Sequence, residues 1–366
     1  MNTTTNGKKS LPIINAKGSS ELDVDAELAA FEAEERKRLG IDDEVVHWTD
    51  KMVGLDFKKS EKPNITLLIG GLTMVQDTLI EASLKGLGYN VQHMRCPDTQ
   101  AFQTGKEYGN RGQCNPTYFT VGNLIQTLID LRDKDGLSVE HIVKHYVFLT
   151  AGACGPCRFG MYVTEYRKAL RDAGFDGFRV MLFQQTGGLK QATGEESGLE
   201  MNPAFFAGIV KGVIAGDVLN AIGYRIRPYE VEPGATDRAL AEVKQNCYDA
   251  LKAQKSILWA LARSRKIFEA VKIDRTNAKP KVSIIGEFWA MTTEGDGNYQ
   301  LQKFLEGEGA ENDIQLVTAW LLYNIWEAKH DTADREELRA QDKGKFGLDG
   351  LGAFGAAKRT LMVSAG

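Results

Sequence analysis

The sequence predicts an α/β fold, with a doubly wound parallel sheet followed by a second, shorter α/β subdomain. The first observation is that short apolar, β-branched runs alternate with segments of helical spacing. The second is the composition, since 43% hydrophobic and 26% charged residues are values of a globular chain. The third is the length of 366 residues, which is enough for two α/β domains with cores of their own.

The first 234 residues contain the main predicted domain. Residues 1–25 are polar and aperiodic and are expected to form a flexible tail. Residues 26–63 are expected to form a helix and a charged linker. The helix begins near Asp25 and stops at Gly40. Residues 64–234 are expected to form the cysteine-bearing α/β domain. Its expected strands are 64–69, 89–94, 145–150 and 178–183, and its expected helices are 73–87, 121–132, 162–173 and 201–219.

Residues 235–328 are expected to contain a bridging helix and the second subdomain. Neither Pro nor Gly interrupts residues 236–272, so one continuous helix that bridges two domains is predicted there. The expected unit of strand, helix and strand follows at 281–286, 301–305 and 314–317. Residues 329–366 are first highly charged and then rich in Gly and Ala, and they are expected to form a tail.

Charge and hydropathy exclude several classes of function. The 45 Lys and Arg residues are outnumbered by 49 Asp and Glu residues, which argues against a nucleic-acid partner held by bulk charge. Residues 1–9 lack the apolar centre of a secretion signal, and the apolar runs fall short of the roughly 20 residues that span a bilayer. A cytoplasmic protein without membrane or nucleic-acid partners is therefore expected.

Four of the five cysteines follow predicted strands. Cys96 and Cys114 come after the second strand, and Cys154 and Cys157 come just after the third. Because the carboxyl ends of parallel strands meet at one edge of a sheet, we expect these four thiols to lie together. Cys247 lies in the predicted long helix, away from any strand end.

Three chemistries fit this set of cysteines. The Cys154-Gly155-Pro156-Cys157 sequence has the spacing of a thioredoxin-like dithiol, although Ala153 stands where thioredoxins usually carry Trp. Four thiolates also suit a structural zinc ion, but zinc sites usually show two close pairs. An iron–sulfur cluster is commonly held by one close pair and distant cysteines, which is the spacing found here.

The residues beside the cysteines suit a negatively charged cluster. Arg95, Arg111 and Arg158 flank them, and Gly155 permits a close backbone approach with N–H donation to sulfur. Each arginine is equally well explained as a surface residue. The chain has neither a P-loop nor a dinucleotide fingerprint, and His93 is expected to be a satisfied core residue rather than a ligand.

These motifs resemble the 2-hydroxyacyl-CoA dehydratase (2-hydroxyglutaryl-CoA dehydratase) family. The closest likeness is to the dehydratase-like part of large acyl-CoA dehydratase activase-related proteins, and it covers roughly residues 26–326. The matching stretches are Cys114-Asn115-Pro116-Thr117-Tyr118-Phe119-Thr120-Val121-Gly122-Asn123-Leu124, Cys154-Gly155-Pro156-Cys157-Arg158-Phe159-Gly160-Met161-Tyr162, Gly286-Glu287-Phe288-Trp289 and Glu308-Gly309-Ala310-Glu311.

The resemblance implies Rossmann-like subdomains that hold a 4Fe-4S cluster. It implies Cys114, Cys154 and Cys157 as ligands, with Cys96 as the fourth or an external ligand or partner residue in its place. Arg111, Arg158 and Gly155 would surround the cluster. In the family, a separate activase ATPase with its own iron-sulfur cluster delivers a low-potential electron, and the dehydratase passes it to a 2-hydroxyacyl-CoA thioester.

This chain departs from the large relatives in two ways, since no activase domain precedes residue 26 and a further cysteine-containing segment has no match here. We therefore expect one component of a dehydratase-like or reductase-like system, with a companion dehydratase subunit and an acyl-CoA substrate as further partners. A thiol–disulfide oxidoreductase that uses Cys154 and Cys157 is the alternative, and a scaffold that binds metal for stability is a third reading.

Overall fold

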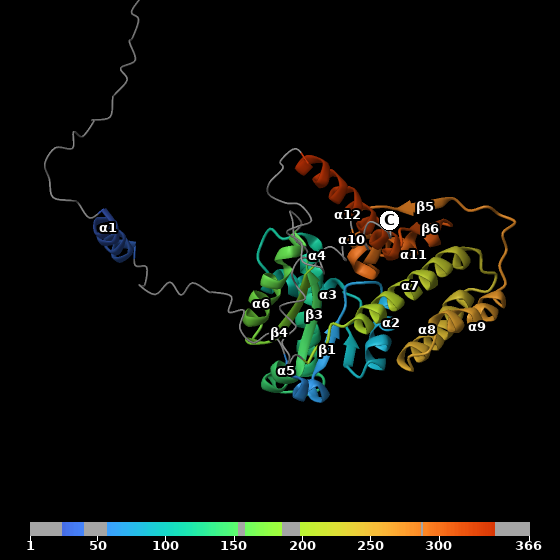
Figure 1. The fold of residues 1–366 in the computed structure, drawn as a ribbon, viewed down its shortest axis with the longest axis horizontal. Coiled ribbons are helices and arrows are strands. Elements are labelled where there is room, and N and C mark those ends of the chain that lie inside the picture. The colour runs from blue at the N-terminus through green and yellow to red at the C-terminus, as the bar shows by residue number, and fades with distance from the viewer. Residues whose placement is uncertain (1–23, 40–56, 153–157, 185–197, 287, 341–366) are drawn as a thin grey trace, which may run out of the picture. The chain divides into compact units, whose positions relative to one another are not determined.

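The computed structural model describes residues 24–39, 57–152, 158–184, 198–286 and 288–340 (Figure 1). Contacts within the chain divide it into two units, residues 1–51 and residues 52–366. The described part of the first unit is helix α1 (Val24–Leu39), which confirms the helix predicted after the N-terminal tail. Ion pairs such as Arg36–Glu32, at a spacing of four residues, follow its surface.

The second unit is a mixed α/β structure built on a parallel sheet. Its four strands lie in the order β2-β1-β3-β4, and every pairing is parallel. All four strands begin and end within two residues of their predicted places. The strands are β1 (Thr66–Ile69), β2 (Asn90–His93), β3 (Tyr146–Gly152) and β4 (Arg179–Gln184).

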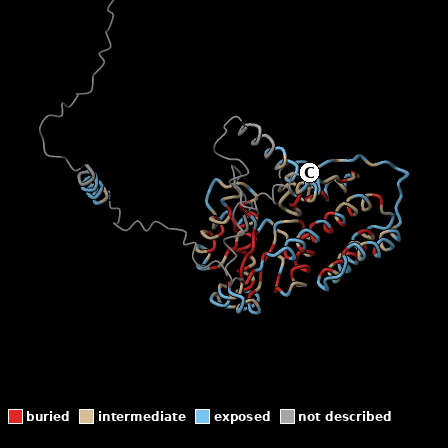
Figure 2. Tube along the Cα trace, in the orientation of Figure 1, coloured by how far each residue is buried: buried red, intermediate tan, exposed pale blue. Residues whose placement is uncertain are grey.

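Alternate residues of the strands enter two different hydrophobic clusters. Leu67 and Ile69 of β1 pack with residues of α2 (Met74–Gly86) and α7 (Pro203–Ile226). Leu68, between them, packs with residues of α4 (Asn115–Asp133), α5 (Val139–His145) and α6 (Tyr162–Asp172). Side chains of a strand point alternately to opposite faces, so helices pack on both faces of this sheet. The buried residues concentrate along these strands and the helices packed on them (Figure 2).

The prediction of one continuous helix over residues 236–272 was wrong. The structure has two helices, α8 (Ala235–Lys252) and α9 (Ile257–Glu269), with a turn between them. Gln254 in that turn has φ of 53°, a left-handed conformation that ends a helix without Gly or Pro. The two helices share a third hydrophobic cluster with α2 and α7, so they extend the helical layer rather than bridge two domains.

The second subdomain contains a two-stranded parallel sheet of β5 (Lys281–Ile284) and β6 (Glu311–Ile314). The second strand was expected at 314–317, but helix α12 already begins at Val317 and continues to Ala340. Part of the expected C-terminal tail is therefore helical. Between the strands lie α10 (Phe288–Thr292), η5 (Gly295–Asn298) and α11 (Leu301–Gly307).

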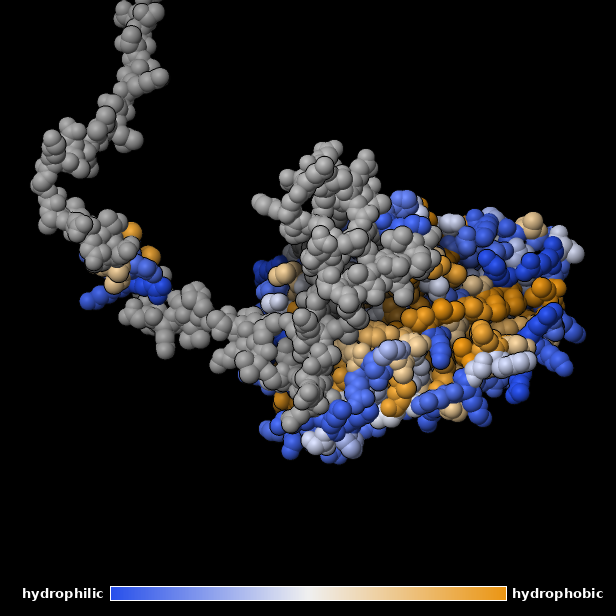
Figure 3. Space-filling view, viewed as in Figure 1, coloured by the Kyte–Doolittle hydropathy of each residue, from blue (hydrophilic) through white to orange (hydrophobic). Residues whose placement is uncertain are grey.

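Helix α7 is more apolar than the sequence analysis allowed for. Among the described residues, the segment Pro203–Tyr229 alone is long and apolar enough to cross a membrane, judged by length and composition. Its glycines at 208, 212 and 216 pack against α2, as expected of a core helix. The opposite face is exposed and carries Phe206, Val210, Ile214 and Val218, a spacing of four that forms the apolar stripe along α7 (Figure 3).

Helix α3 (Thr99–Tyr108) was not predicted, and it crosses α4 at very close range. The crossing uses one glycine from each helix, Gly105 and Gly122. A Cβ added at Gly122 would overlap the carbonyl oxygen of Ala101, and one added at Gly105 would overlap that of Tyr118. The two backbones therefore touch directly, which fixes α4 and the cysteine that precedes it.

We expect Gly122→Ala to destabilise the protein by about 3 kcal/mol, because the added methyl meets backbone that cannot move aside. The measurement is the midpoint of denaturant unfolding. Gly307→Ala is the matched control, since no atom lies within 4 Å of its added Cβ. That variant should stay within about 1 kcal/mol of the parent. Equal stability of the two variants would contradict the close crossing.

Candidate functional site

Two of the four predicted ligands, Cys96 and Cys114, lie in the described part of the chain. Cys96 follows the end of β2, and Cys114 directly precedes α4. Strand β3 ends at Gly152, two residues before Cys154, and η2 (Arg158–Met161) begins immediately after Cys157. Cys154, Gly155 and Cys157 themselves, and the side chain of Arg158, lie outside the described part of the chain.

Cys114 forms the N-cap of α4, with the extended backbone that this position requires. Its half-buried sulfur faces two hydroxyl groups. Thr117 Oγ1 lies 3.0 Å from Sγ, and the Tyr162 hydroxyl lies 3.2 Å from it. Thr117 belongs to the first turn of α4, and Tyr162 is the first residue of α6. The sulfur is therefore held between the beginnings of two helices.

These surroundings favour the thiolate form of Cys114. Burial raises the pKa of its thiol, but hydrogen bonds with Thr117 and Tyr162 outweigh that effect and bring the pKa below its ordinary value. Burial, followed by the hydrogen bond to Cys114, raises the pKa of Tyr162 far above its usual range. Tyr162 thus keeps its proton and can donate it to the sulfur. A thiolate is the form in which cysteine binds metals.

The loop before Cys114 is anchored to α6 by a buried carboxylate. Glu165 accepts hydrogen bonds from the Asn110 side chain at 2.6 Å, from the Asn110 backbone at 3.2 Å and from the Gln113 side chain at 3.1 Å. The Tyr118 hydroxyl donates to the Asn110 carbonyl oxygen at 3.0 Å. Consequently the segment that precedes Cys114 is held against α6, the helix that follows Cys157 in the sequence.

Cys96 lies in different surroundings. Its thiol donates to the carbonyl oxygen of Glu294 at 3.4 Å, and it packs against Gly295. Burial and the neighbouring carboxylates, of which Glu294 and Asp296 act most strongly, raise the pKa of Cys96 to about 11. Cys96 is therefore a thiol at neutral pH in the metal-free protein. Within the described residues, no three His, Cys, Asp or Glu side chains are grouped as a metal site would require.

The two described arginines that flank the cysteines, and Cys247, have no hydrogen bond to Cys96 or Cys114. Arg111 is exposed, and Arg95 forms an ion pair with Asp130 at 3.2 Å. Cys247 is fully buried within the third hydrophobic cluster, as a packing residue. Burial raises the pKa of its thiol to about 11. Cys247 is thus unsuited to bind metal, in agreement with its position in the sequence.

Three carboxylates cap helices across the boundary between the first domain and the second subdomain. Glu294 accepts from the Met74 N–H of α2 at 2.8 Å, and Asp296 accepts from the Thr99 N–H of α3 at 2.8 Å. In the other direction, Asp217 of α7 accepts from the first N–H groups of α12, at 3.2 Å and 2.7 Å. We call Asp217, Glu294 and Asp296 the cross-capping carboxylates. The loop that carries two of them covers Cys96.

A second buried carboxylate, Glu81 of α2, ties β2 to two helices. It bonds His93 through both the ring Nδ1 and the backbone N–H, the latter at 2.9 Å. It also accepts from Lys85 at 2.7 Å and from Tyr248 of α8 at 3.0 Å. Burial opposes ionisation, but the hydrogen bonds, that of His93 foremost, lower the pKa of Glu81 to about 2. His93 is thus a satisfied structural residue, as expected.

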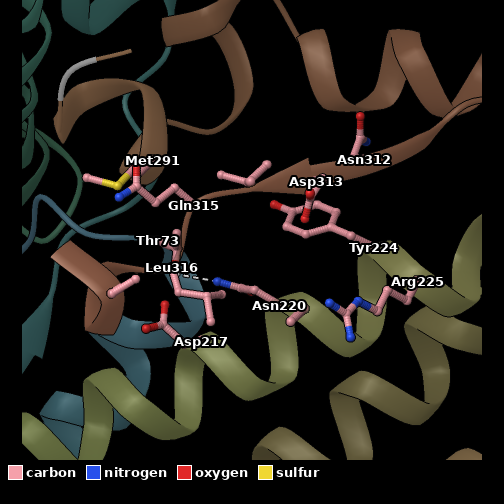
Figure 4. A pocket seen from close by; sticks show the side chains of 13 residues that line it. Thr73, Asp217, Asn220, Tyr224, Arg225, Met291, Asn312, Asp313, Gln315 and Leu316 are labelled. Atoms are coloured by element: carbon pink, nitrogen blue, oxygen red, sulfur yellow. Dashed lines mark hydrogen bonds between the residues drawn. The ribbon is translucent and has the colours of Figure 1, made fainter. Parts of the chain in front are cut away.

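A cavity of about 270 Å³ lies between α7 and the end of β6 (Figure 4). The Asn220 side chain donates to Thr73 Oγ1 at 2.9 Å on its wall. The lining carries both signs of charge, Arg225 against Asp217 and Asp313, so it favours no one ligand charge. None of the described cysteines lines this cavity.

Sequence reasoning missed the residues that hold Cys114. Thr117 and Tyr162 were named only as members of the matching motifs and Glu165 not at all, although all three are less than 8% exposed. The available signal was Pro116 just after Cys114, because Pro is common in the first turn of a helix and would have placed the start of α4 there. A helix starting at Cys114 would have put Thr117 on the cysteine's own turn.

Comparison with known proteins adds no relative. No protein-family model matches the chain, and no curated protein matches its sequence. The family resemblance therefore depends on the residues of the motifs alone.

The lowered thiol pKa of Cys114 and the raised thiol pKa of Cys247 predict different rates of alkylation. In the reduced, metal-free protein at pH 7.5, iodoacetamide should label Cys114 more than about tenfold faster than Cys247, because the thiolate reacts and Cys247 is a buried thiol. Peptide mass spectrometry measures both rates in one sample. Unfolding in urea should bring the two rates together. Equal rates in the native protein would contradict the described environment of Cys114.

The Glu81 network predicts a pH dependence of stability. The folded pKa of Glu81 lies below its unfolded value of 4.5, so its contribution is present above pH 4.5 and is lost as the pH falls towards 2. Glu81→Gln should cost about 2 kcal/mol of unfolding free energy at pH 7. The difference between parent and variant should shrink between pH 4.5 and pH 2.5, measured by urea unfolding. A difference independent of pH would argue against an ionised Glu81.

Proposed function

We propose that this protein is an iron–sulfur component of a 2-hydroxyacyl-CoA dehydratase-like, or related ATP-driven reductase, system of the cytoplasm. It accepts a low-potential electron from an activase ATPase that has a cluster of its own. A companion dehydratase subunit and an acyl-CoA substrate belong to the same proposal. The single observation that supports it best is the contact between the sulfur of Cys114 and the first residue of α6.

That contact links two of the cysteine motifs. Tyr162 lies 3.2 Å from Cys114 Sγ, and only η2, four residues long, separates it from Cys157. A 3₁₀ helix of four residues rises about 8 Å, so the described chain resumes at Arg158 only one short helix before the residue that contacts Cys114. On the other side of the pair, β3 brings the chain to the carboxyl edge of the sheet. The contact with Tyr162 on one side of the pair, and the end of β3 on the other, support our proposal that Cys154 and Cys157 bind the same cluster as Cys114.

The order of the strands supports the same location. We propose that the sheet is of the Rossmann-like, doubly wound class, since it has the order β2-β1-β3-β4 and helices packed on both faces. In such sheets the order reverses between β1 and β3, and ligands bind beside the carboxyl ends of those two strands. The Cys154–Cys157 pair directly follows β3.

The described donor at this site fits a 4Fe-4S cluster. Cys114 is half-buried, has a lowered pKa and lies within hydrogen-bond distance of two hydroxyl groups, which are features suited to a thiolate that binds iron. A bound cluster would supply one-electron transfer at low potential. Cys114, Cys154 and Cys157 would hold it, with Gly155, Arg111 and Arg158 near it, while Glu165 and the α3–α4 crossing keep Cys114 in place.

Cys96 is proposed as the fourth ligand. Its thiol must lose a proton to bind iron, and the four carboxylates near it, those of Asp77, Asp98, Glu294 and Asp296, oppose that loss in the metal-free protein. The same carboxylates also disfavour the net negative charge of a cluster with four thiolates, so they count against Cys96 as the fourth ligand. An external ligand or a partner's residue is the alternative for the fourth position.

The second candidate function is thiol–disulfide exchange by Cys154 and Cys157. One observation favours it: the pair connects the end of strand β3 to η2 and α6, which is the strand-to-helix setting of reactive dithiols. This function leaves Cys114 without a role, because its partners are two hydroxyl groups.

Purification without oxygen tests the proposal. We expect a brown protein with about four irons per chain, measured by absorption and iron analysis. Cys114→Ala and Cys157→Ala should abolish the colour, whereas Cys247→Ala, the matched control in the core, should keep it. Cys96→Ala should also lower the iron content if Cys96 is the fourth ligand.

Other results would exclude the proposal. A colourless protein with two reactive thiols at Cys154 and Cys157 would support the dithiol, and bound zinc would support a structural metal site. Equal loss of colour in the Cys157→Ala and Cys247→Ala variants would mean that the site is placed wrongly.

A further inference from the structure

We propose that the hydroxyl groups of Tyr162 and Thr117 set the reduction potential of the centre that Cys114 binds. This inference is based on the proposed function and adds to it two residues that act through the Cys114 sulfur. They are positioning residues, because they contact the ligand rather than a substrate.

Both hydroxyl groups must donate once Cys114 is a ligand. A metal-bound cysteine is a thiolate without a proton, so its sulfur can only accept. Thr117 Oγ1 and the Tyr162 hydroxyl are the two side-chain groups within hydrogen-bond distance of this sulfur among the described residues, at 3.0 Å and 3.2 Å. The sulfur therefore receives two O–H hydrogen bonds from opposite helices.

The two donors are held rigidly. Thr117 is 1% exposed and lies in the first turn of α4, next to the α3–α4 crossing. Tyr162 is 7% exposed, belongs to the hydrophobic cluster under α4 and α6, and packs edge-to-face on Phe159 with ring centroids 5.1 Å apart. Water has little access to either group, so the hydrogen bonds are stronger than at a surface.

The effect on the potential has a definite sign. When an iron–sulfur centre gains an electron, part of the added negative charge falls on its sulfur ligands. Hydrogen bonds to those ligands stabilise the reduced form more than the oxidised form and raise the potential. Removal of either hydroxyl should therefore make the potential more negative, with no change in the number of irons.

The test compares three variants of the full chain, purified without oxygen. Tyr162→Phe and Thr117→Val each remove one hydroxyl and keep the shape of the side chain. Each should lower the equilibrium constant for one-electron reduction about tenfold, which corresponds to about 59 mV. A redox titration followed by electron paramagnetic resonance measures the potential, and iron analysis shows that the centre is intact.

Tyr166→Phe is the matched control. Tyr166 lies one turn further along α6 and is 3% exposed, so its variant removes an equally buried hydroxyl from the same helix. Its hydroxyl is not among the groups within hydrogen-bond distance of Cys114. We expect Tyr166→Phe to leave the potential of the parent unchanged.

The outcomes separate this inference from the proposed function. A parent protein without iron would overturn the proposed function and this inference with it. An intact centre whose potential is the same in the parent, Tyr162→Phe and Thr117→Val would overturn this inference alone. If Tyr162→Phe fails to retain iron, Thr117→Val decides by itself, since a more negative potential supports the inference and an unchanged one overturns it. An equal shift in Tyr166→Phe would also overturn it.

Discussion

Parallel pairing of the four strands directs every carboxyl end, and the helix beginnings that follow, to one edge of the sheet. The first N–H groups of those helices have no partner within the helix. Here Glu294 accepts a hydrogen bond from the first N–H group of α2, and Asp296 accepts one from the first N–H group of α3. At the beginning of α4, the same edge places the sulfur of Cys114. One edge of the sheet thus meets both the carboxylates by which the second subdomain binds the first domain and the thiolate proposed to bind iron.

Much of the second unit could be predicted from the sequence because its strands are short apolar runs bounded by polar residues. The break between α8 and α9 could not, since residues 253–256 contain neither Gly nor Pro and the turn depends on the left-handed conformation of Gln254. Packing of both helices on α2 and α7 compensates for that conformation. Tertiary contacts, rather than local propensity, decided where the helix ends.

The candidate site was predictable to the same limited extent. Chain direction alone locates Cys96 near the carboxyl edge, because it follows β2 by three residues, whereas Cys114 lies beyond the unpredicted helix α3. The partners of each sulfur depend on which distant segments pack together, such as Cys114 with Tyr162, 48 residues away. For the same reason no sequence pattern indicated that Cys96 lies beneath the loop of Glu294, 198 residues away, and so differs from Cys114 in acidity.

Each half of the second unit caps helices of the other half through the cross-capping carboxylates, so the two halves depend on each other. A fragment that stopped at residue 234 would retain α2 and α3 but lose Glu294 and Asp296, and it would uncover the thiol of Cys96. A fragment that began there would lack Asp217 and leave the first turn of α12 unsatisfied. Gene fusions and domain transplants that respect sheet boundaries alone would therefore cut through shared hydrogen bonds, so the two halves have to be transplanted together.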